Sequence, residues 1–288
     1  MSTKLPVKQS LPLLGNSISS LFQHPKILYP FAVIAFIQLL FMEILFFAPR
    51  FPLSVLFKEI ILKLGGKLYL HYPFNFDLVN HWFQSGQIWI FLFISSLFIG
   101  KAVAIIAKIN RGQPVEEKMP VIGIKRYVNL IVAFLIILLM VYGFTSFYGT
   151  IIRRALQIRS TSGIYFLIKQ AILIGSPYFN LVISVIVTTL FAYVVPIVVL
   201  EDRNVFAAVW KNFQIIWGSF WTLLIVIGAS SMFYIPVLLI RSNQRWFFSF
   251  VTPELWQTFV IVSLFFMLLI DAIQYAAMTT SYLLTKEE

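Results

Sequence analysis

The chain has 288 residues, contains no cysteine, and only 11% of its residues are charged. Without cysteine, disulfide bridges, thiolate catalysis and cysteine-ligated metal sites are excluded. The sequence also lacks the P-loop pattern Gly-x-x-x-x-Gly-Lys-Ser/Thr, the pattern His-Glu-x-x-His and the pattern Gly-x-Ser-x-Gly. ATP hydrolysis and the common soluble hydrolase reactions are therefore not predicted within this chain, and we expect no cofactor.

The chain contains six long apolar stretches, and 60% of its residues are hydrophobic. Roughly 20 apolar residues in a helix span the hydrocarbon core of a bilayer. The predicted spans are about residues 28–48, 87–107, 127–148, 180–200, 219–240 and 257–278. The longest interval between spans has 38 residues, too few for a catalytic domain of roughly 100 residues. We predict an all-α integral membrane six-helix bundle that forms a single transmembrane domain over residues 1–288.

The basic residues predict both orientation and partners. Lys and Arg are denser in the segments on the side of the N-terminus, which favours cytoplasmic N- and C-termini. The formal charge of +11 predicts contacts with anionic lipid headgroups, worth about 1 kcal/mol for each basic residue near the surface. Because the charges are scattered among short loops, no nucleic-acid partner is predicted.

Short amphipathic segments precede some spans. Residues 204–216 are predicted to form a helix with one apolar face directed to the membrane interface. That face consists of Val205, Phe206, Val209, Trp210, Phe213, Ile216 and Trp217. Residues 13–22 repeat this pattern at an offset of 188, and a weaker copy (Val121, Ile124, Val128) precedes the third span. The bundle is thus expected to contain three repeats of an interfacial helix plus a transmembrane hairpin; chance similarity between apolar segments is the alternative.

One segment carries a family resemblance. Residues 196–202 (Pro-Ile-Val-Val-Leu-Glu-Asp), 205–212 (Val-Phe-Ala-Ala-Val-Trp-Lys-Asn) and 216–221 (Ile-Trp-Gly-Ser-Phe-Trp) carry it. The pattern resembles a largely uncharacterised family of six-span bacterial membrane proteins that includes the membrane domain fused to some glycerophosphoryl diester phosphodiesterases. Here Lys211-Asn212 replaces the family's more usual Arg-Ser step. The resemblance implies an architecture and a bacterial cytoplasmic (inner) membrane location, not an activity.

Charges inside spans are the best pointers to function in a membrane protein. Lys101 and Asp271 are each the fifteenth residue of spans that run in the same direction, so they lie at similar depth. We expect them to form an intramembrane polar pair, serving as a gate or proton-linked site or as a structural ion pair. The alternative has Lys101 extending toward the interface and Asp271 facing a water cleft. Glu43, near the end of the first span, is a further candidate polar site.

Two other features have competing interpretations. Pro196 and Pro236 fall inside spans and are expected to kink them. His71, Asp77 and His81 share one loop, where two imidazoles and a carboxylate can bind zinc; interfacial anchoring of the two histidines is favoured over a metal site. No metal site is therefore predicted.

Three functions remain open. The leading hypothesis is a non-enzymatic multi-span protein in membrane organisation, lipid handling or a larger membrane assembly. The second is a transporter or permease-type subunit, whose partner ATPase docks on the segment containing the candidate residues Arg203, Val209, Trp210 and Lys211. The third is a membrane enzyme acting on lipid through Glu43 or the loop with His71 and His81. Fold-level analogy alone does not separate them.

Overall fold

The computed structural model describes residues 6–71, 75–115, 119–158, 162–243 and 252–287, and within these residues it contains helices and no strand. The N-terminal half comprises α1 (Ser10–Gln23), α2 (Leu28–Phe47), α3 (Ser54–Leu64), α4 (Asn75–Trp89), α5 (Ser96–Asn110) and α6 (Ile124–Leu156). The C-terminal half comprises α7 (Gly163–Leu190), α8 (Val194–Glu201), α9 (Val205–Ile215), α10 (Phe220–Met232), α11 (Ile235–Ser242) and α13 (Pro253–Glu287). The all-α prediction is confirmed.

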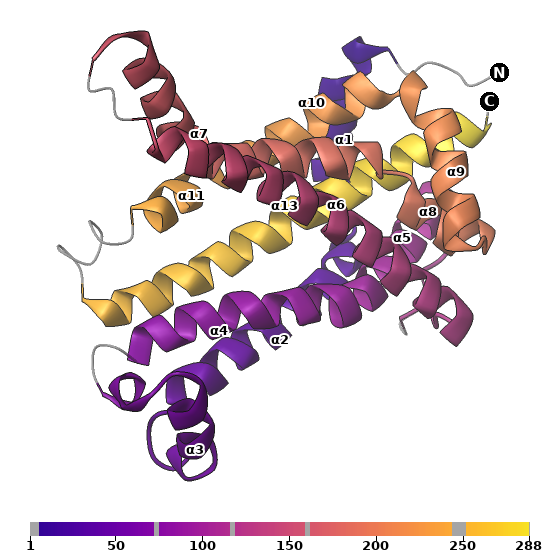
Figure 1. Cartoon of the computed structure of the whole chain (residues 1–288). Coiled ribbons are helices and arrows are strands. Elements are labelled where there is room, and N and C mark those ends of the chain that lie inside the picture. Colours follow the sequence, from indigo (N-terminus) through magenta and orange to yellow (C-terminus); the bar gives the residue numbers. More distant parts are fainter. Residues whose placement is uncertain (1–5, 72–74, 116–118, 159–161, 244–251, 288) are drawn as a thin grey trace.

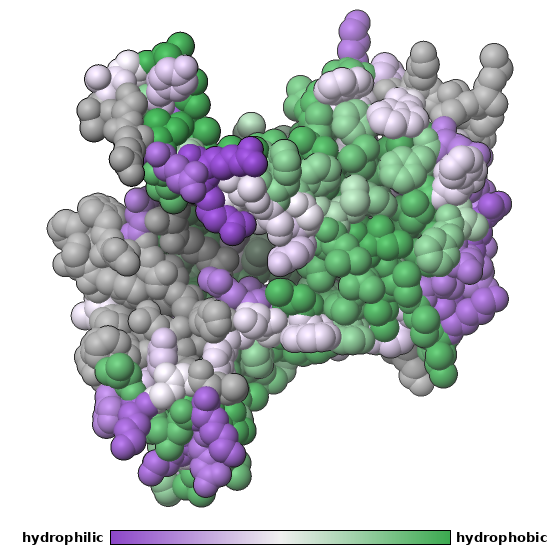
Figure 2. All heavy atoms as spheres, viewed as in Figure 1, coloured by the Kyte–Doolittle hydropathy of each residue, from purple (hydrophilic) through white to green (hydrophobic). Residues whose placement is uncertain are grey.

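Five helical segments are long and apolar enough to cross a bilayer. They are Pro25–Phe47, Trp82–Asn110, Ile124–Leu156, Tyr178–Glu201 and Gln257–Lys286. A sixth is obtained if the bent pair Val205–Gly218 and Phe220–Met232 is taken as one span. Figure 2 shows the expected surface, with hydrophobic side chains over the middle of the visible face and hydrophilic ones toward its two ends. The protein is a multi-span membrane bundle.

Both prolines inside predicted spans break the helix rather than kink it. Pro196 is the third residue of α8, directly after a turn at residues 191–193 that separates α8 from α7. Pro236 is the second residue of α11, after a turn at residues 233–234 that separates α11 from α10. A proline fits the first turn of a helix because the missing N–H is not needed there, whereas in a helix interior it removes a hydrogen bond. The predicted fifth span is therefore two short helices.

The second span contains a different irregularity. Residues Ile90–Ser95, between α4 and α5, form a π-helical turn. The wider turn frees the carbonyl of Phe93, which accepts hydrogen bonds from the Tyr127 hydroxyl at 2.9 Å and the Ser96 hydroxyl at 3.2 Å. Such π-helical turns are frequent at functional sites.

The helices converge at one end of the bundle and diverge at the other (Figure 1). We call the end with α1, α8, α9 and the C-terminal part of α13 the closed end, and the end with α3, the N-terminal part of α4, α11 and the N-terminal part of α7 the open end. The main buried core extends through the closed end and includes Phe134, Tyr193, Ile197 and Tyr282. A smaller core of Met42, Leu45, Phe83, Val260 and Leu264 joins α2, α4 and α13.

Helices are present at two of the three segments that were expected to form interfacial helices, namely α1 and α9. The axis of the segment containing α9 turns by 93° before α10, so α9 lies across the closed end (Figure 1). Short 3₁₀ turns, Pro25–Ile27 and Ile216–Gly218, connect α1 to α2 and α9 to α10 in the same order. The middle copy is absent: α6 begins at Ile124 and runs unbroken to Leu156, and Val121 is outside any helix. The helix expected before the third span, already the weakest copy in the sequence, is therefore not a separate element.

Candidate functional site

A cavity of about 560 Å³ lies inside the bundle, between the N-terminal helices α2 and α4 and the C-terminal helices α7, α10 and α13. Aliphatic and aromatic side chains form most of its wall. Its polar lining residues are Gln38, Gln84, Gln87, Ser95, Asn180, Ser184, Thr188, Ser231, Tyr234, Asp271, Gln274 and Tyr275. Ligand sites in proteins have this mixture of apolar walls and a few polar groups, and volumes of roughly 300–1,000 Å³.

The cavity runs along the bundle axis. Its wall includes Ala192 and Met278 near the closed end, and Gln84 and Leu238 toward the open end. Figure 2 shows the visible face hollowed between the projecting part of α7 and the α3–α4 region, which is the open end in Figure 1. The cavity therefore extends toward the end of the bundle opposite to the two chain termini.

Three polar residues of α13 face this cavity together. Asp271, Gln274 and Tyr275 are three and four residues apart, a spacing that places them on one side of a helix. The Gln274 amide donates hydrogen bonds to the hydroxyls of Ser230 at 3.1 Å and Ser231 at 3.0 Å, both on α10. Gln274 is thereby held in place, whereas the Asp271 carboxylate has no hydrogen-bond or ion-pair partner among the described residues.

The expected pair of Lys101 and Asp271 is not formed, since none of the ion pairs between described residues joins them. The Lys101 ammonium lies over the ring of Phe98, 5.2 Å from its centroid, and Lys101 is not part of the cavity wall. The expectation came from span position, and position along a span does not fix which way a side chain points around the helix. Of these two residues, only Asp271 faces the cavity.

Glu43 has a partner elsewhere. Its carboxylate accepts a hydrogen bond of 2.7 Å from the Gln257 amide, which ties α2 to the start of α13. Glu43 does not line the cavity. This hydrogen bond explains how a carboxylate is accommodated near the end of a span. A carboxylate that is bonded to a neighbouring helix leaves fewer hydrogen-bonding positions without a partner.

A second polar region surrounds the helix break at residues 191–193. Asn212 of α9, fully buried, accepts a hydrogen bond from the Tyr193 backbone amide at 3.0 Å and donates one to the Leu190 carbonyl at 2.7 Å. The break before Pro196 leaves this amide and this carbonyl without their helical partners, and buried backbone groups need substitutes. Asn212, which is not part of the predicted apolar face of the interfacial helix, is therefore a structural residue.

The hydroxyl of Tyr193 extends the same network. It forms hydrogen bonds of 2.5 Å with Ser219 at the start of α10 and 2.7 Å with Ser281 of α13. All three residues are buried. Through Tyr193 and Asn212 the turn between α7 and α8 is bonded to α9, α10 and α13, which accounts for the tight packing of the closed end.

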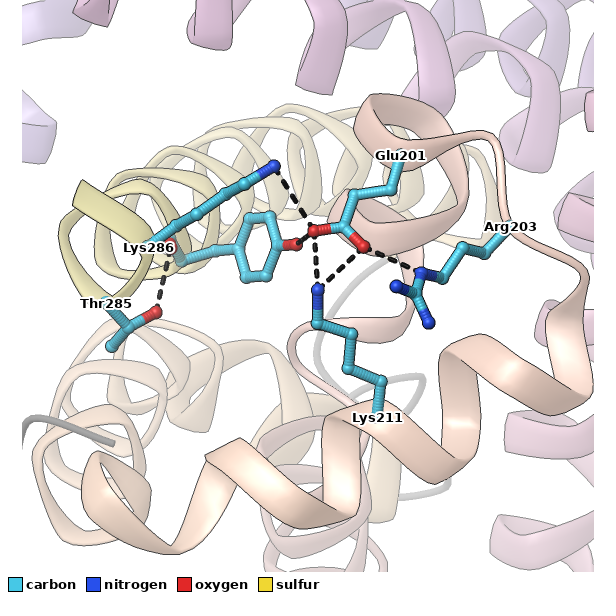
Figure 3. Close-up of polar contacts among 6 residues, drawn as sticks. Glu201, Arg203, Lys211, Thr285 and Lys286 are labelled. Atoms are coloured by element: carbon cyan, nitrogen blue, oxygen red, sulfur yellow. Dashed lines mark hydrogen bonds and ion pairs between the residues drawn. The ribbon is translucent and has the colours of Figure 1, made fainter. Parts of the chain in front are cut away.

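Glu201, the last residue of α8, gathers three cations (Figure 3). Its carboxylate oxygens lie 2.6 Å from the Lys211 ammonium, 2.9 Å from the Arg203 guanidinium and 3.3 Å from the Lys286 ammonium. The Tyr282 hydroxyl donates a further hydrogen bond of 2.5 Å. The Glu201 side chain is only 9% exposed. In the sequence, the only sign of its role is a single acidic residue after an apolar run.

The four candidate docking residues therefore differ from one another. Lys211 and Arg203 point to Glu201, and Val209 is half-buried against the core. Trp210 is 70% exposed, as is Phe206 one turn earlier. The predicted single apolar face of α9 is in fact divided: Val205, Ala208 and Ile216 pack inward beside Asn212, whereas Phe206 and Trp210 face outward.

An exposed pair completes the closed end. The Arg126 guanidinium at the start of α6 lies 2.6 Å from the Asp202 carboxylate. That hydrogen bond holds the pKa of Asp202 below its usual range. Asp202 adopts a left-handed backbone conformation with φ of 54° at the end of α8, where the chain reverses direction into α9.

The loop with the three possible zinc ligands is described only in part. His71 is exposed, and Asp77 and His81 have side chains outside the described residues. The zinc hypothesis is therefore not tested here.

Comparison of the chain with protein families, with curated proteins and with solved structures found no match.

Proposed function

We propose that the protein is a non-enzymatic lipid-handling protein of the bacterial cytoplasmic membrane, which holds an amphipathic molecule in its central cavity. The observation that carries this proposal is the cavity itself: about 560 Å³ of space inside a membrane bundle, with mostly apolar walls and polar side chains that include the charged Asp271 of α13. An acyl chain fits the apolar walls, since burying apolar surface is the main favourable term in such binding, and a polar headgroup fits the side with Asp271 and Gln274.

The resemblance of residues 196–221 to the six-span bacterial family supports the location. Basic residues at the closed end, including Lys26, Lys108 and Arg111, support an orientation with that end, and hence both termini, in the cytoplasm. In this orientation the cavity opens toward the outer side of the membrane.

A cavity-filling variant tests the proposal. Ser184 on α7 lines the cavity, and Val182 on the same helix is exposed and does not line it. We expect Ser184→Trp to abolish binding of a single-chain lipid, such as tetradecylphosphocholine added to the purified protein and counted by native mass spectrometry. Val182→Trp should bind as the unaltered protein does. Equal binding by both variants would show that the cavity is not the site.

The permease-type alternative has one supporting observation. Helix α9 is fixed across the closed end by Asn212 and Lys211 while Phe206 and Trp210 remain exposed, the arrangement that a docking ATPase requires. The bilayer interface is the competing occupant of this aromatic face. Because the chain has no cysteine, a nitroxide on Phe206→Cys reports the answer directly in nanodiscs: contact with lipid supports the interface, and full exposure to water supports a protein partner.

A further inference from the structure

We infer that the headgroup held in the central cavity is cationic, an amine or a quaternary ammonium group that Asp271 recognises. This inference rests on the proposed binding of an amphipathic molecule and names its chemical class. Asp271 is the one charged residue on the part of the cavity wall that the structure describes. No lysine or arginine among the described lining residues offsets its charge.

The surroundings of Asp271 leave its carboxylate available. No hydrogen bond or ion pair joins it to another described residue, and Lys101, the nearest candidate by depth, is engaged with Phe98. A lone charge inside a bilayer costs at least about 2.5–3.5 kcal/mol on insertion scales. Such residues normally face a cavity or a partner, and mark ligand or ion pathways. A bound cation provides the partner that the protein itself does not.

Aromatic side chains of the cavity wall fit the same ligand. Tyr275, one helical turn further along α13, lines the cavity together with Phe31, and their ring centroids lie 6.2 Å apart. Tyr234 and Phe91 add two more rings to the wall. Ring faces attract cations, and quaternary ammonium ligands are commonly held by aromatic rings. An anionic headgroup would meet the Asp271 charge and no counter-charge from a described lining residue.

The neighbouring polar groups orient the ligand without competing for it. Gln274 is held by its hydrogen bonds to Ser230 and Ser231. Its amide N–H groups are hydrogen-bond donors, and a quaternary ammonium group has no atom that can accept a hydrogen bond from them. The cationic group therefore belongs beside Asp271, and the acyl chain extends past Gln274 into the apolar part of the cavity. Charge recognition depends on one side chain, and it can be removed without closing the cavity.

The test compares headgroups on one tail. Tetradecyltrimethylammonium is cationic, tetradecylglycerol is neutral and tetradecyl sulfate is anionic. Each compound is titrated onto the protein in nanodiscs, and its dissociation constant is measured by native mass spectrometry. We expect the unaltered protein to prefer the cationic to the neutral compound roughly tenfold, equivalent to about 1.4 kcal/mol. Asp271→Asn should bring this ratio close to one while the neutral compound still binds.

Two controls separate this inference from the proposed function. Glu43→Gln removes a carboxylate that is bonded to Gln257 and does not line the cavity, so the cationic preference should be unchanged. Ser184→Trp should abolish binding of all three compounds. If Ser184→Trp abolishes binding but the unaltered protein does not distinguish the charges, the cationic class is wrong and the lipid site stands. If Ser184→Trp leaves binding intact, the site itself is wrong.

Discussion

At the closed end, buried polar groups are bonded to one another across helices, whereas at the cavity the Asp271 carboxylate faces open space. Asn212, Tyr193 and Glu201 together bond to backbone and side chains of five different helices or turns. On the cavity wall, Gln274 is bonded and Asp271 is not. The closed end also has one exception, since the buried hydroxyl of Thr279 has no partner among the described residues.

This difference separates structural from functional polarity in a membrane bundle. Satisfied buried networks make a region rigid and specify its packing, whereas an unsatisfied polar group lowers stability. A polar group left without a partner beside a cavity is therefore a candidate for ligand contact. The comparison predicts that substitutions at the closed end will destabilise the protein and that removing the unpaired carboxylate will not.

The largest loss of stability is expected for Asn212→Leu. The variant leaves the Tyr193 amide and the Leu190 carbonyl buried without partners, and each such group costs roughly 1–3 kcal/mol. The thermal midpoint in detergent should fall strongly. Gln214→Leu, an exposed position on the same helix, is the matched control and should change little. A midpoint for Asn212→Leu equal to that of the control would mean that the closed end does not depend on this contact.

The next largest loss of stability is expected for Glu201→Gln. The amide retains the shape but loses the charge that holds Lys211, Arg203 and Lys286, and hydrogen bonds to charged groups are worth roughly 1.5–3 kcal/mol. Glu59→Gln, at an exposed acidic residue of α3 at the open end, is the control. Circular dichroism melts of both variants provide the measurement, and equal melting temperatures would remove the distinction between the two ends.

Asp271→Leu, in contrast to the two variants above, should not lower the stability of the protein. Because the carboxylate has no partner, its removal relieves a cost of up to about 3 kcal/mol, so the thermal midpoint should rise or stay unchanged. Combined with Lys101→Met, the two effects should add to within about 0.5 kcal/mol, as for independent sites. A double variant that recovers stability lost in the single variants would indicate that Lys101 and Asp271 are partners after all.

The smallest effect is expected for Asp202→Asn. Arg126 lowers the folded-state pKa of Asp202, so its contribution is present above the unfolded pKa near 4 and disappears as the pH falls through the folded value. The midpoint difference between variant and unaltered protein should be constant from about pH 5 to 8 and shrink below about pH 4. A difference that instead grows as the pH falls would contradict the assignment of this pair.

Much of the fold follows from the sequence because span length and apolar composition depend only on local residues. Spans one to four and six were predicted within several residues of the observed helices. The fifth span was not, because a proline inside a span can bend or break the helix, and the outcome depends on whether neighbouring groups supply hydrogen bonds. At Pro196 such a neighbour exists in Asn212; at Pro236 the turn is closed by backbone bonds from Phe233 and Tyr234 to Ser230 and Ser231.

The candidate site was less predictable for a geometric reason. Depth in a membrane follows from counting residues, but the direction of a side chain depends on the rotation of the helix, which is set by packing. Lys101 and Asp271 have the same position in their predicted spans but face different neighbours. The role of Asn212 was missed for the same reason, because its polar side chain fits an interfacial helix equally well. The cavity itself has no sequence signature.

The contact made by Asn212 has a consequence for the biogenesis of the protein. Asn212 follows Leu190 by 22 residues and Tyr193 by 19, so the turn in the fourth span acquires these hydrogen bonds only when α9 docks. Until then the Tyr193 amide and the Leu190 carbonyl lack their native partner. Residues 178–215 therefore fold in the membrane as one unit rather than as a span followed by a loop.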